Sequence, residues 1–155
     1  ATDIEPWSVR VTQQNAAMNG VARLVRARLA DGWGERHVRA GRPYDLVFAN
    51  ILARPLCAMA KHLARGLAPG GTAILAGLLT TQARMVLAAH RRQGLALERA
   101  VRVGAWTALV VRRRGAYSAK DIPSAGFASA GKGLWYGLPP VRAWWSAFAL
   151  AINSG

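Results

Sequence analysis

The segment from Tyr44 to Ala53 reads YDLVFANILA, and it is the stretch that decides the fold. Residues 46–49 are apolar throughout and do not alternate with polar residues, which is typical of a buried strand covered on both faces. Asn50 ends this strand, and Pro55 follows where the next helix should begin. In open α/β sheets, ligands bind at the carboxyl ends of the strands, so Asn50 is a candidate functional residue. The alternative is that Asn50 is only a turn residue or a helix cap.

Upstream of this strand, the sequence predicts a strand that ends at Asp3 and a helix that begins at Pro6. Proline is favoured at a first helical position, because its missing N–H would have no partner there. Gly20 is a suitable left-handed stop for the helix. Residues 21–30 are expected to form a short strand near a sheet edge. Residues 31–42, which are rich in glycine and charge, are expected to form a loop.

Downstream of Asn50, periodicity and breakers predict two helices and three strands. The expected elements are a helix over 53–68, a break at Pro69-Gly70-Gly71, a strand over 72–77, a helix over 81–93, and strands over 95–103 and 106–112. Gly104 lies between the last two strands and indicates a tight reversal, so this pair should be antiparallel. The fold class is therefore α/β, with a partial, mostly parallel sheet and an antiparallel hairpin at its carboxyl end.

The charge balance is unusual, with 21 Lys and Arg against 7 Asp and Glu, for a net charge of +14. Such a charge favours an anionic partner such as RNA, the ribosome or a membrane surface, although an arginine-rich composition can also reflect a genome-wide bias. Cys57 is the only cysteine, so no disulfide framework and no cysteine metal cluster is expected. Three scattered histidines lack metal-ligand spacing, and His62 and His90 are expected at the surface. No signal peptide or membrane-spanning run is found, and a cytoplasmic location is expected.

The chain divides by composition into residues 1–114, which carry the α/β pattern, and residues 115–155, which do not. Glycine, alanine and serine become more frequent after residue 115, and aromatic residues crowd the last 21 positions. This tail is either an aromatic interaction segment or an incidental extension, and the latter is favoured.

Asp3 is the second candidate site residue, because it stands at the end of a predicted parallel strand. A carboxylate in that place can accept both ribose hydroxyls of a nucleoside, since it offers two acceptor oxygens and no donor. Asp3 has an alternative role as a helix cap. Glu5 is a less suitable ribose ligand, because it lies after the strand and beside Pro6.

These motifs resemble those of a known family. The segments ATDIEP (1–6), DLVFANILA (45–53), LAPGG (67–71), LAGLL (75–79) and GAWTAL (104–109) are similar to those of the ribosomal protein L-eleven methyltransferases. These are class I S-adenosylmethionine-dependent enzymes with a Rossmann-like sheet. The likeness covers about residues 1–113. The Pro-Gly-Gly element is common to many methyltransferases, whereas the Asn-Ile-Leu-Ala stretch is more specific.

The resemblance implies a protein N-methyltransferase that uses S-adenosyl-L-methionine to methylate lysine and N-terminal amines of a ribosomal protein. Asp3 would bind the cofactor ribose, and Asn50 would lie beside the methyl group and accept a hydrogen bond from the substrate amine. Ile51 and Leu52 stand where methyltransferases of adenine or glutamine carry Pro-Pro-Tyr, so the stacking ring for a flat substrate is missing. This favours an aliphatic amine, which Asn50, Ile51 and Leu52 would bind. No metal is needed for this chemistry.

The resemblance has gaps. The family's glycine-rich motif and its separate recognition domain would lie before Asp3, and the 155 residues do not contain them. We therefore expect the chain to be the carboxyl-terminal part of a catalytic domain and to be inactive alone. The alternatives are an RNA or other protein methyltransferase of the same fold, or a non-catalytic basic module that binds RNA. A nicotinamide dehydrogenase fragment fits Asn50 and the terminal hairpin poorly.

Overall fold

The computed structural model describes residues 1–115. By its contacts the chain divides after Tyr117, and all described residues belong to the first unit, Ala1–Tyr117. The predictions made for the aromatic tail lie outside the described residues.

The amino-terminal part is a small two-stranded parallel sheet with one helix. Its elements are β1 (Thr2–Asp3), α1 (Pro6–Met18) and β2 (Arg28–Leu29). As predicted, proline stands at the first turn of α1, and Gly20 takes a φ of 70° just after the helix. The strand expected within residues 21–30 is only two residues long.

The connection to the main sheet is not the loop that was expected. It contains a short 3-10 helix, η1 (Gly32–Gly34), and one helical turn and a half, α2 (Arg36–Ala40). Aromatic contacts explain the order: the rings of Trp33 and Tyr44 meet edge to face with centroids 6.0 Å apart, and the Tyr44 hydroxyl donates to the Val38 carbonyl at 2.7 Å. Composition alone suggested a loop because it does not describe these side-chain contacts.

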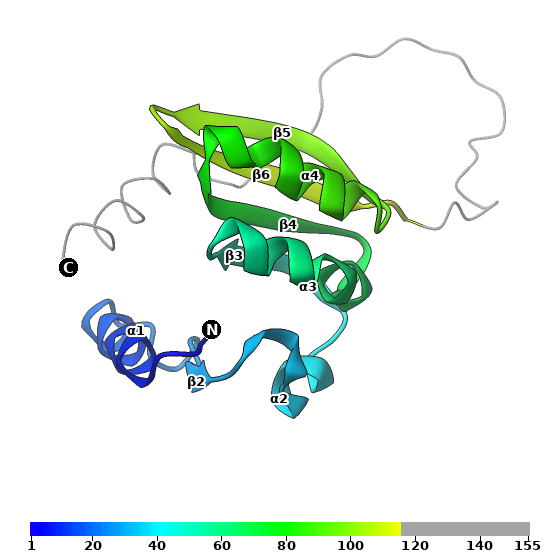
Figure 1. Ribbon diagram of the computed structural model, residues 1–155. Helices are drawn as coiled ribbons and strands as arrows, with labels where there is room; N and C mark the ends of the chain where they lie inside the picture. The colour runs from blue at the N-terminus through cyan, green and yellow to red at the C-terminus, as the bar shows by residue number, and fades with distance from the viewer. Residues whose placement is uncertain (116–155) are drawn as a thin grey trace, which may run out of the picture. The chain divides into compact units, whose positions relative to one another are not determined.

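The main sheet has four strands in the order β3-β4-β6-β5 (Figure 1). They are β3 (Tyr44–Asn50), β4 (Leu67–Leu79), β5 (Leu95–Val103) and β6 (Trp106–Arg113). β3 and β4 are parallel, whereas β6 runs antiparallel to both β4 and β5, as the predicted hairpin requires. β4 begins earlier than expected, because Pro69-Gly70-Gly71 lies inside it at an irregularity in its pairing with β3.

Helices α3 (Ala53–Gly66) and α4 (Ala83–Arg91) lie on one face of this sheet, and η2 (Thr80–Gln82) leads into α4 (Figure 1). Their apolar side chains and the inner face of the strands form the core. Its fully buried large members are Leu56, Leu67, Leu75, Leu78, Val86, Leu109 and Val111. Among residues 1–115, no helix is long and apolar enough to cross a bilayer.

The expectation that β3 is covered on both faces is wrong for the described residues. Val47 and Ala49 pack against the core beneath the helices. Leu46 and Phe48, which alternate with them, remain 47% and 46% exposed. The continuous apolar run at 46–49 suggested that both faces of β3 are buried. In the structure, α3 and α4 cover only the face that carries Val47 and Ala49.

Candidate active site

Asn50 stands at the carboxyl end of β3, beside Ala76 of β4. The next residue of β4 is Gly77, whose φ of 75° is unfavourable for side chains. A Cβ added at Gly77 would lie 2.8 Å from the Asn50 Oδ1 and 3.2 Å from the Ile51 carbonyl oxygen. Glycine at position 77 therefore leaves the space that the Asn50 carboxamide occupies.

Ile51 and Leu52 follow Asn50 directly and lead into α3. Leu52 is the N-cap residue of that helix, and its carbonyl accepts the first helical hydrogen bond from the Leu56 amide at 3.1 Å. The two side chains are 37% and 75% exposed. The carboxamide of Asn50, itself exposed, thus lies next to an accessible aliphatic surface.

Asp3 stands at the carboxyl end of β1, in the two-stranded sheet. Its Oδ1 accepts a hydrogen bond from the Glu5 amide at 2.9 Å, which closes a turn before α1. The N-cap residue of α1 is Glu5, and no side chain caps the helix. Asp3 is exposed, and its second oxygen makes no hydrogen bond within residues 1–115.

Sequence reasoning did not identify two threonines that lie next to the carboxyl end of β4, Thr80 in η2 and Thr107 in β6. Thr80 and the buried Thr107 place their hydroxyls 3.0 Å apart, and the Thr80 amide donates to the Ala105 carbonyl at 2.8 Å. Trp106 pairs with Leu79 at this end and is 51% exposed. Only the register between β4 and β6 brings these residues to the Asn50 end of the sheet, and no sequence motif gives that register.

Comparison with known families identifies the chain. The family model described as ribosomal protein L11 methyltransferase (PrmA) matches residues 1–114. The chain belongs to the ribosomal protein L11 methyltransferase family. Proteins of that name from a Caulobacter species and from Bradyrhizobium diazoefficiens are 49% and 46% identical to it over 113 and 115 residues. These matches cover 72% and 74% of this chain but only 38% and 39% of the relatives, so the chain spans well under half their length.

Solved structures confirm the Rossmann-like methyltransferase fold. The ribosomal protein L11 methylase of Lactobacillus delbrueckii subsp. bulgaricus superposes with a TM-score of 0.66 at 26% identity. The superposition covers 74% of this chain and 56% of the Lactobacillus protein's chain. An RNA methyltransferase from Salinibacter ruber, solved with S-adenosyl-L-homocysteine, shares the fold at a TM-score of 0.55 and 19% identity, over 76% of this chain and 67% of its own.

The predicted site residues of this family member fall into two groups. Asn50, Ile51 and Leu52 are brought together at the end of β3, with Gly77 against the carboxamide. Asp3 stands in the other sheet, and among the described residues no hydrogen bond joins it to Asn50. Within residues 1–115, no three acidic, histidine or cysteine side chains are grouped so as to hold a metal ion.

His90 does not lie at the surface as expected; it is fully buried, whereas His62 is exposed. The side chain lies on the core face of α4, and its Nδ1 is 2.8 Å from the Val86 carbonyl oxygen. Burial lowers the pKa of His90, and the hydrogen bond to Val86 partly opposes this effect. A neutral ring with its proton on Nδ1 satisfies that contact, and it leaves Nε2 buried without a partner.

Proposed function

We propose that the protein to which this chain belongs transfers methyl groups from S-adenosyl-L-methionine to lysine and N-terminal amines of ribosomal protein L11, in the cytoplasm. The observation that carries the proposal is the Asn50 carboxamide, which lies at the carboxyl end of β3 against Gly77 and beside exposed Ile51 and Leu52. Family membership over residues 1–114 supports the same reaction.

The chemistry requires a neutral amine. Its nitrogen lone pair forms the new N–C bond while the methyl–sulfur bond breaks, the bonding pair passes to sulfur, and the amine releases a proton. A free lysine has a pKa of ~10.4, so presenting it uncharged at pH 7 costs roughly 4–5 kcal/mol. The Asn50 oxygen can accept a hydrogen bond from this amine without favouring the ammonium form, as a carboxylate would. Orientation against Asn50 contributes further to the rate.

Ile51 and Leu52 suit the stem of such a substrate. A lysine side chain is a flexible aliphatic chain, and it buries its methylene groups readily on apolar surface. Both residues are exposed beside Asn50, and neither offers a ring for stacking a base. Ile51 and Leu52 therefore support an amine substrate, and the exposed rings at this end of the sheet belong to Phe48 and Trp106.

Asp3 is proposed to bind the cofactor ribose. The donor chemistry fits, because Asp3 is exposed and its Oδ2 is free to accept hydroxyl hydrogens while Oδ1 holds the turn to Glu5. Calorimetric titration of the 155-residue chain with S-adenosylhomocysteine tests this assignment. Asp3→Ala should abolish the binding heat, whereas Asp45→Ala, an exposed aspartate at the other end of a strand, should not. Equal titration of both variants would refute the ribose role.

Methyl transfer is tested separately, with recombinant ribosomal protein L11 and radiolabelled cofactor. The chain is assayed alone and as a fusion that carries, before Ala1, the glycine-rich motif expected upstream of Asp3, taken from the part of the Caulobacter relative that the match leaves uncovered. We expect turnover only from the fusion. Turnover by the chain alone would refute the expected inactivity, and a fusion that binds cofactor but methylates no amine would refute the proposed reaction.

In the same fusion, Asn50→Asp tests the role of the carboxamide. A carboxylate beside the amine favours its charged form, so the rate at pH 7 should fall at least about tenfold and recover as the pH is raised by about 1–3 units. Asn15→Asp adds the same charge on exposed α1 and should leave the pH profile unchanged. A pH profile of Asn50→Asp identical to that of the parent fusion would contradict contact between residue 50 and the amine.

A further inference from the structure

Positive charge is concentrated in α4, β5 and β6. Residues 83–114 include eight arginines and a single acidic residue, Glu98. The net charge of these 32 positions is therefore about half of the +14 carried by the whole chain. Such a concentration gives one part of the surface a strongly positive potential.

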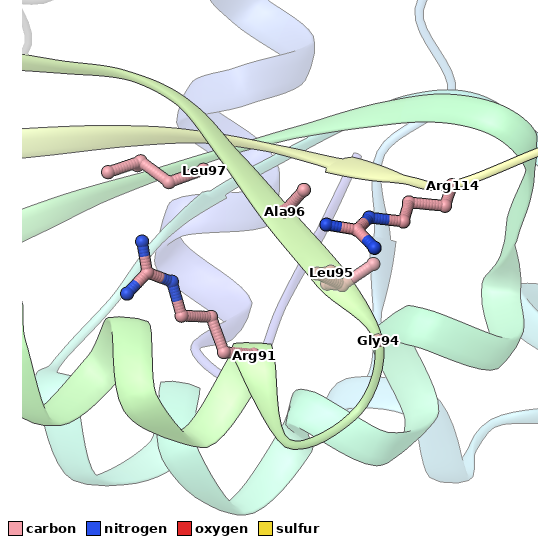
Figure 2. Close-up of a pocket in the computed structure, with 6 residues that line it drawn as sticks. All are labelled: Arg91, Gly94, Leu95, Ala96, Leu97 and Arg114. Carbon is pink, nitrogen blue, oxygen red and sulfur yellow. The ribbon is translucent and has the colours of Figure 1, made fainter.

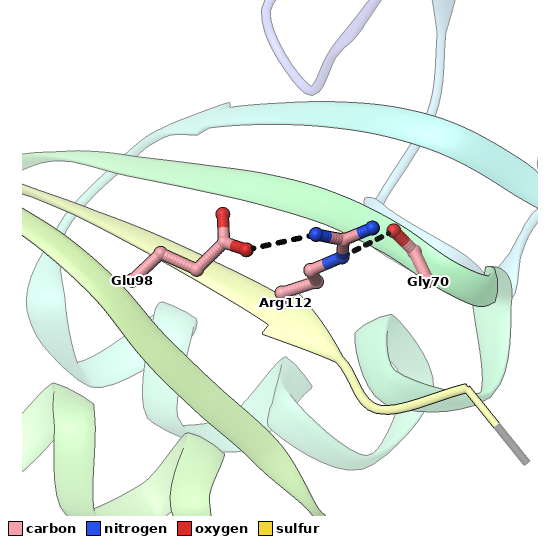
Figure 3. Close-up of polar contacts among 3 residues, drawn as sticks. All are labelled: Gly70, Glu98 and Arg112. Atoms are coloured by element: carbon pink, nitrogen blue, oxygen red, sulfur yellow. Dashed lines mark hydrogen bonds and ion pairs between the residues drawn. The ribbon is translucent and has the colours of Figure 1, made fainter. Parts of the chain in front are cut away.

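The single acidic residue does not neutralise the rest, because it is already paired. Arg112 makes an ion pair with Glu98 at 3.2 Å and donates from Nε to the Gly70 carbonyl at 2.9 Å (Figure 3). Arg113 donates to the Leu67 carbonyl. Within residues 1–115, the other six arginines of the segment have no carboxylate partner: Arg84, Arg91, Arg92, Arg99, Arg102 and Arg114.

Two adjoining hollows are lined by three of these six arginines, Arg84, Arg91 and Arg114. We refer to the two hollows together as the arginine hollow. The first hollow, of about 500 Å³, lies between Arg91 and Arg114 over the beginning of β5. Figure 2 shows Arg91 extending from the end of α4 and Arg114 from the end of β6, on either side of Leu95. The second hollow, of about 440 Å³, is lined by Arg84 and Arg91, which are two helical turns apart on α4.

We propose that the arginine hollow binds the phosphodiester backbone of RNA. Guanidinium groups match phosphate oxygens with two parallel hydrogen bonds, and no carboxylate among the lining residues competes for them. Aromatic residues are also absent from the lining, so bases have nothing to stack on. Recognition should therefore depend on the charged backbone of a duplex and be independent of base sequence.

The test is fluorescence anisotropy with a short labelled RNA duplex, titrated with the 155-residue chain between about 50 and 200 mM salt. One variant replaces the three arginines of the hollow with glutamine. The matched control makes the same change at three exposed arginines of the amino-terminal half, Arg23, Arg36 and Arg39. Both variants lose three charges, and circular dichroism and thermal melting establish that both are folded.

We expect the hollow variant to weaken binding at least about tenfold and to lower the slope of log affinity against log salt by about two to three, at ~0.9 per phosphate contact. The control should keep most of the parent slope. Equal losses in the two variants would show that net charge alone attracts the RNA and would overturn the proposal. So would binding of anionic lipid vesicles or polyglutamate that exceeds RNA binding and shows the same dependence on the hollow.

Discussion

Replacing Gly77 with alanine should have a modest effect on the stability of the fold and a larger effect on the position of the Asn50 side chain. Gly77 has a φ of 75°, and a Cβ there would lie 2.8 Å from the Asn50 Oδ1. Gly104→Ala is the matched control, because its φ is 56° and a Cβ there would meet nothing within 4 Å. Each variant pays about 1–2 kcal/mol for the left-handed backbone. A less flexible unfolded chain returns roughly 0.4–1 kcal/mol of that cost.

The two variants should therefore be similar in stability but different at the site. Gly77→Ala displaces the far end of the Asn50 side chain, which costs about 0.5–1.5 kcal/mol for leaving its rotamer, and it also crowds the Ile51 carbonyl oxygen at 3.2 Å. We expect both melting temperatures to fall by about 4–8 °C per kcal/mol, with Gly77→Ala somewhat lower. Because misplacing a reacting group by about 1 Å can cost ~100-fold, methyl transfer by the fusion should fall about 10–100-fold for Gly77→Ala and less than about twofold for Gly104→Ala.

The assay combines thermal melting, the rate of methyl transfer, and the side-chain amide resonances of Asn50 in a nitrogen–proton correlation spectrum of the 155-residue chain. The resonances provide a readout that does not depend on turnover. The idea that Gly77 makes room for the Asn50 carboxamide is refuted if Gly77→Ala and Gly104→Ala show the same Asn50 resonances and the same rate of methyl transfer.

Three further predictions concern the core. Burial holds the His90 pKa below its usual 6.5, so the unfolded chain takes up a proton at a higher pH than the folded chain. The free energy of unfolding should therefore fall as the pH drops below about 6.5. Urea titrations across this range should show a smaller fall in His90→Leu and the full fall in His62→Leu. Thr107→Val removes a buried hydroxyl contact with Thr80 and should cost about 1 kcal/mol in a urea titration, whereas an unchanged midpoint would show the contact to be neutral. Gly66→Ala would place a Cβ against the Trp33 indole and should destabilise the chain by about 1–3 kcal/mol, which thermal melting with near-ultraviolet dichroism can check.

The regular elements were predictable because local physical constraints are strong there. Gly104 takes a φ of 56° between two strands whose bounds match the expected ones to within one residue. The start of α1 at Pro6 and the beginning of α3 beside Pro55 follow in the same way from the fixed φ of proline. In each case a single residue restricts the backbone, so no tertiary partner is needed to read the element.

The failures share a different cause, since each depends on how side chains pack, which residue composition alone does not describe. The segment expected as a loop is ordered by Tyr44 and by the packing of Trp33 near the end of α3. His90 was placed at the surface because its polarity was weighed without its position on the helix, where it follows Val86 by one turn and shares its buried face. Local composition carries no signal of either contact.

From the sequence, Asn50 could be proposed as a candidate site residue because ligands gather at strand ends, whereas the residues around it could not be placed beside it. Gly77 was recognised only as part of a motif, and its role follows from the parallel register that sets Asn50 against Ala76. Thr107 and Trp106 arrive at the same end through the antiparallel pairing of β6 with β4. Register is a property of two strands together, so a single sequence did not reveal these neighbours.

The topology also separates Arg91 and Arg114 from Asn50, whereas Arg84 stands in the first turn of α4, nearer the Asn50 end of the sheet. β6 runs antiparallel to β4, so the end of β6 lies near the amino end of β4. The start of β5 lies there too, because Leu95 pairs with Arg113. Asn50 pairs with Ala76, toward the carboxyl end of β4. At about 3.3 Å per residue, the separation along the sheet is roughly 15–20 Å. RNA held between Arg91 and Arg114 would thus leave the Asn50 end accessible to an amine. A variant with glutamine at Arg91 and Arg114 alone should therefore lose RNA affinity while its fusion methylates isolated ribosomal protein L11 within about twofold of the parent rate. A parallel loss of both would show that the two ends of the sheet act as one site.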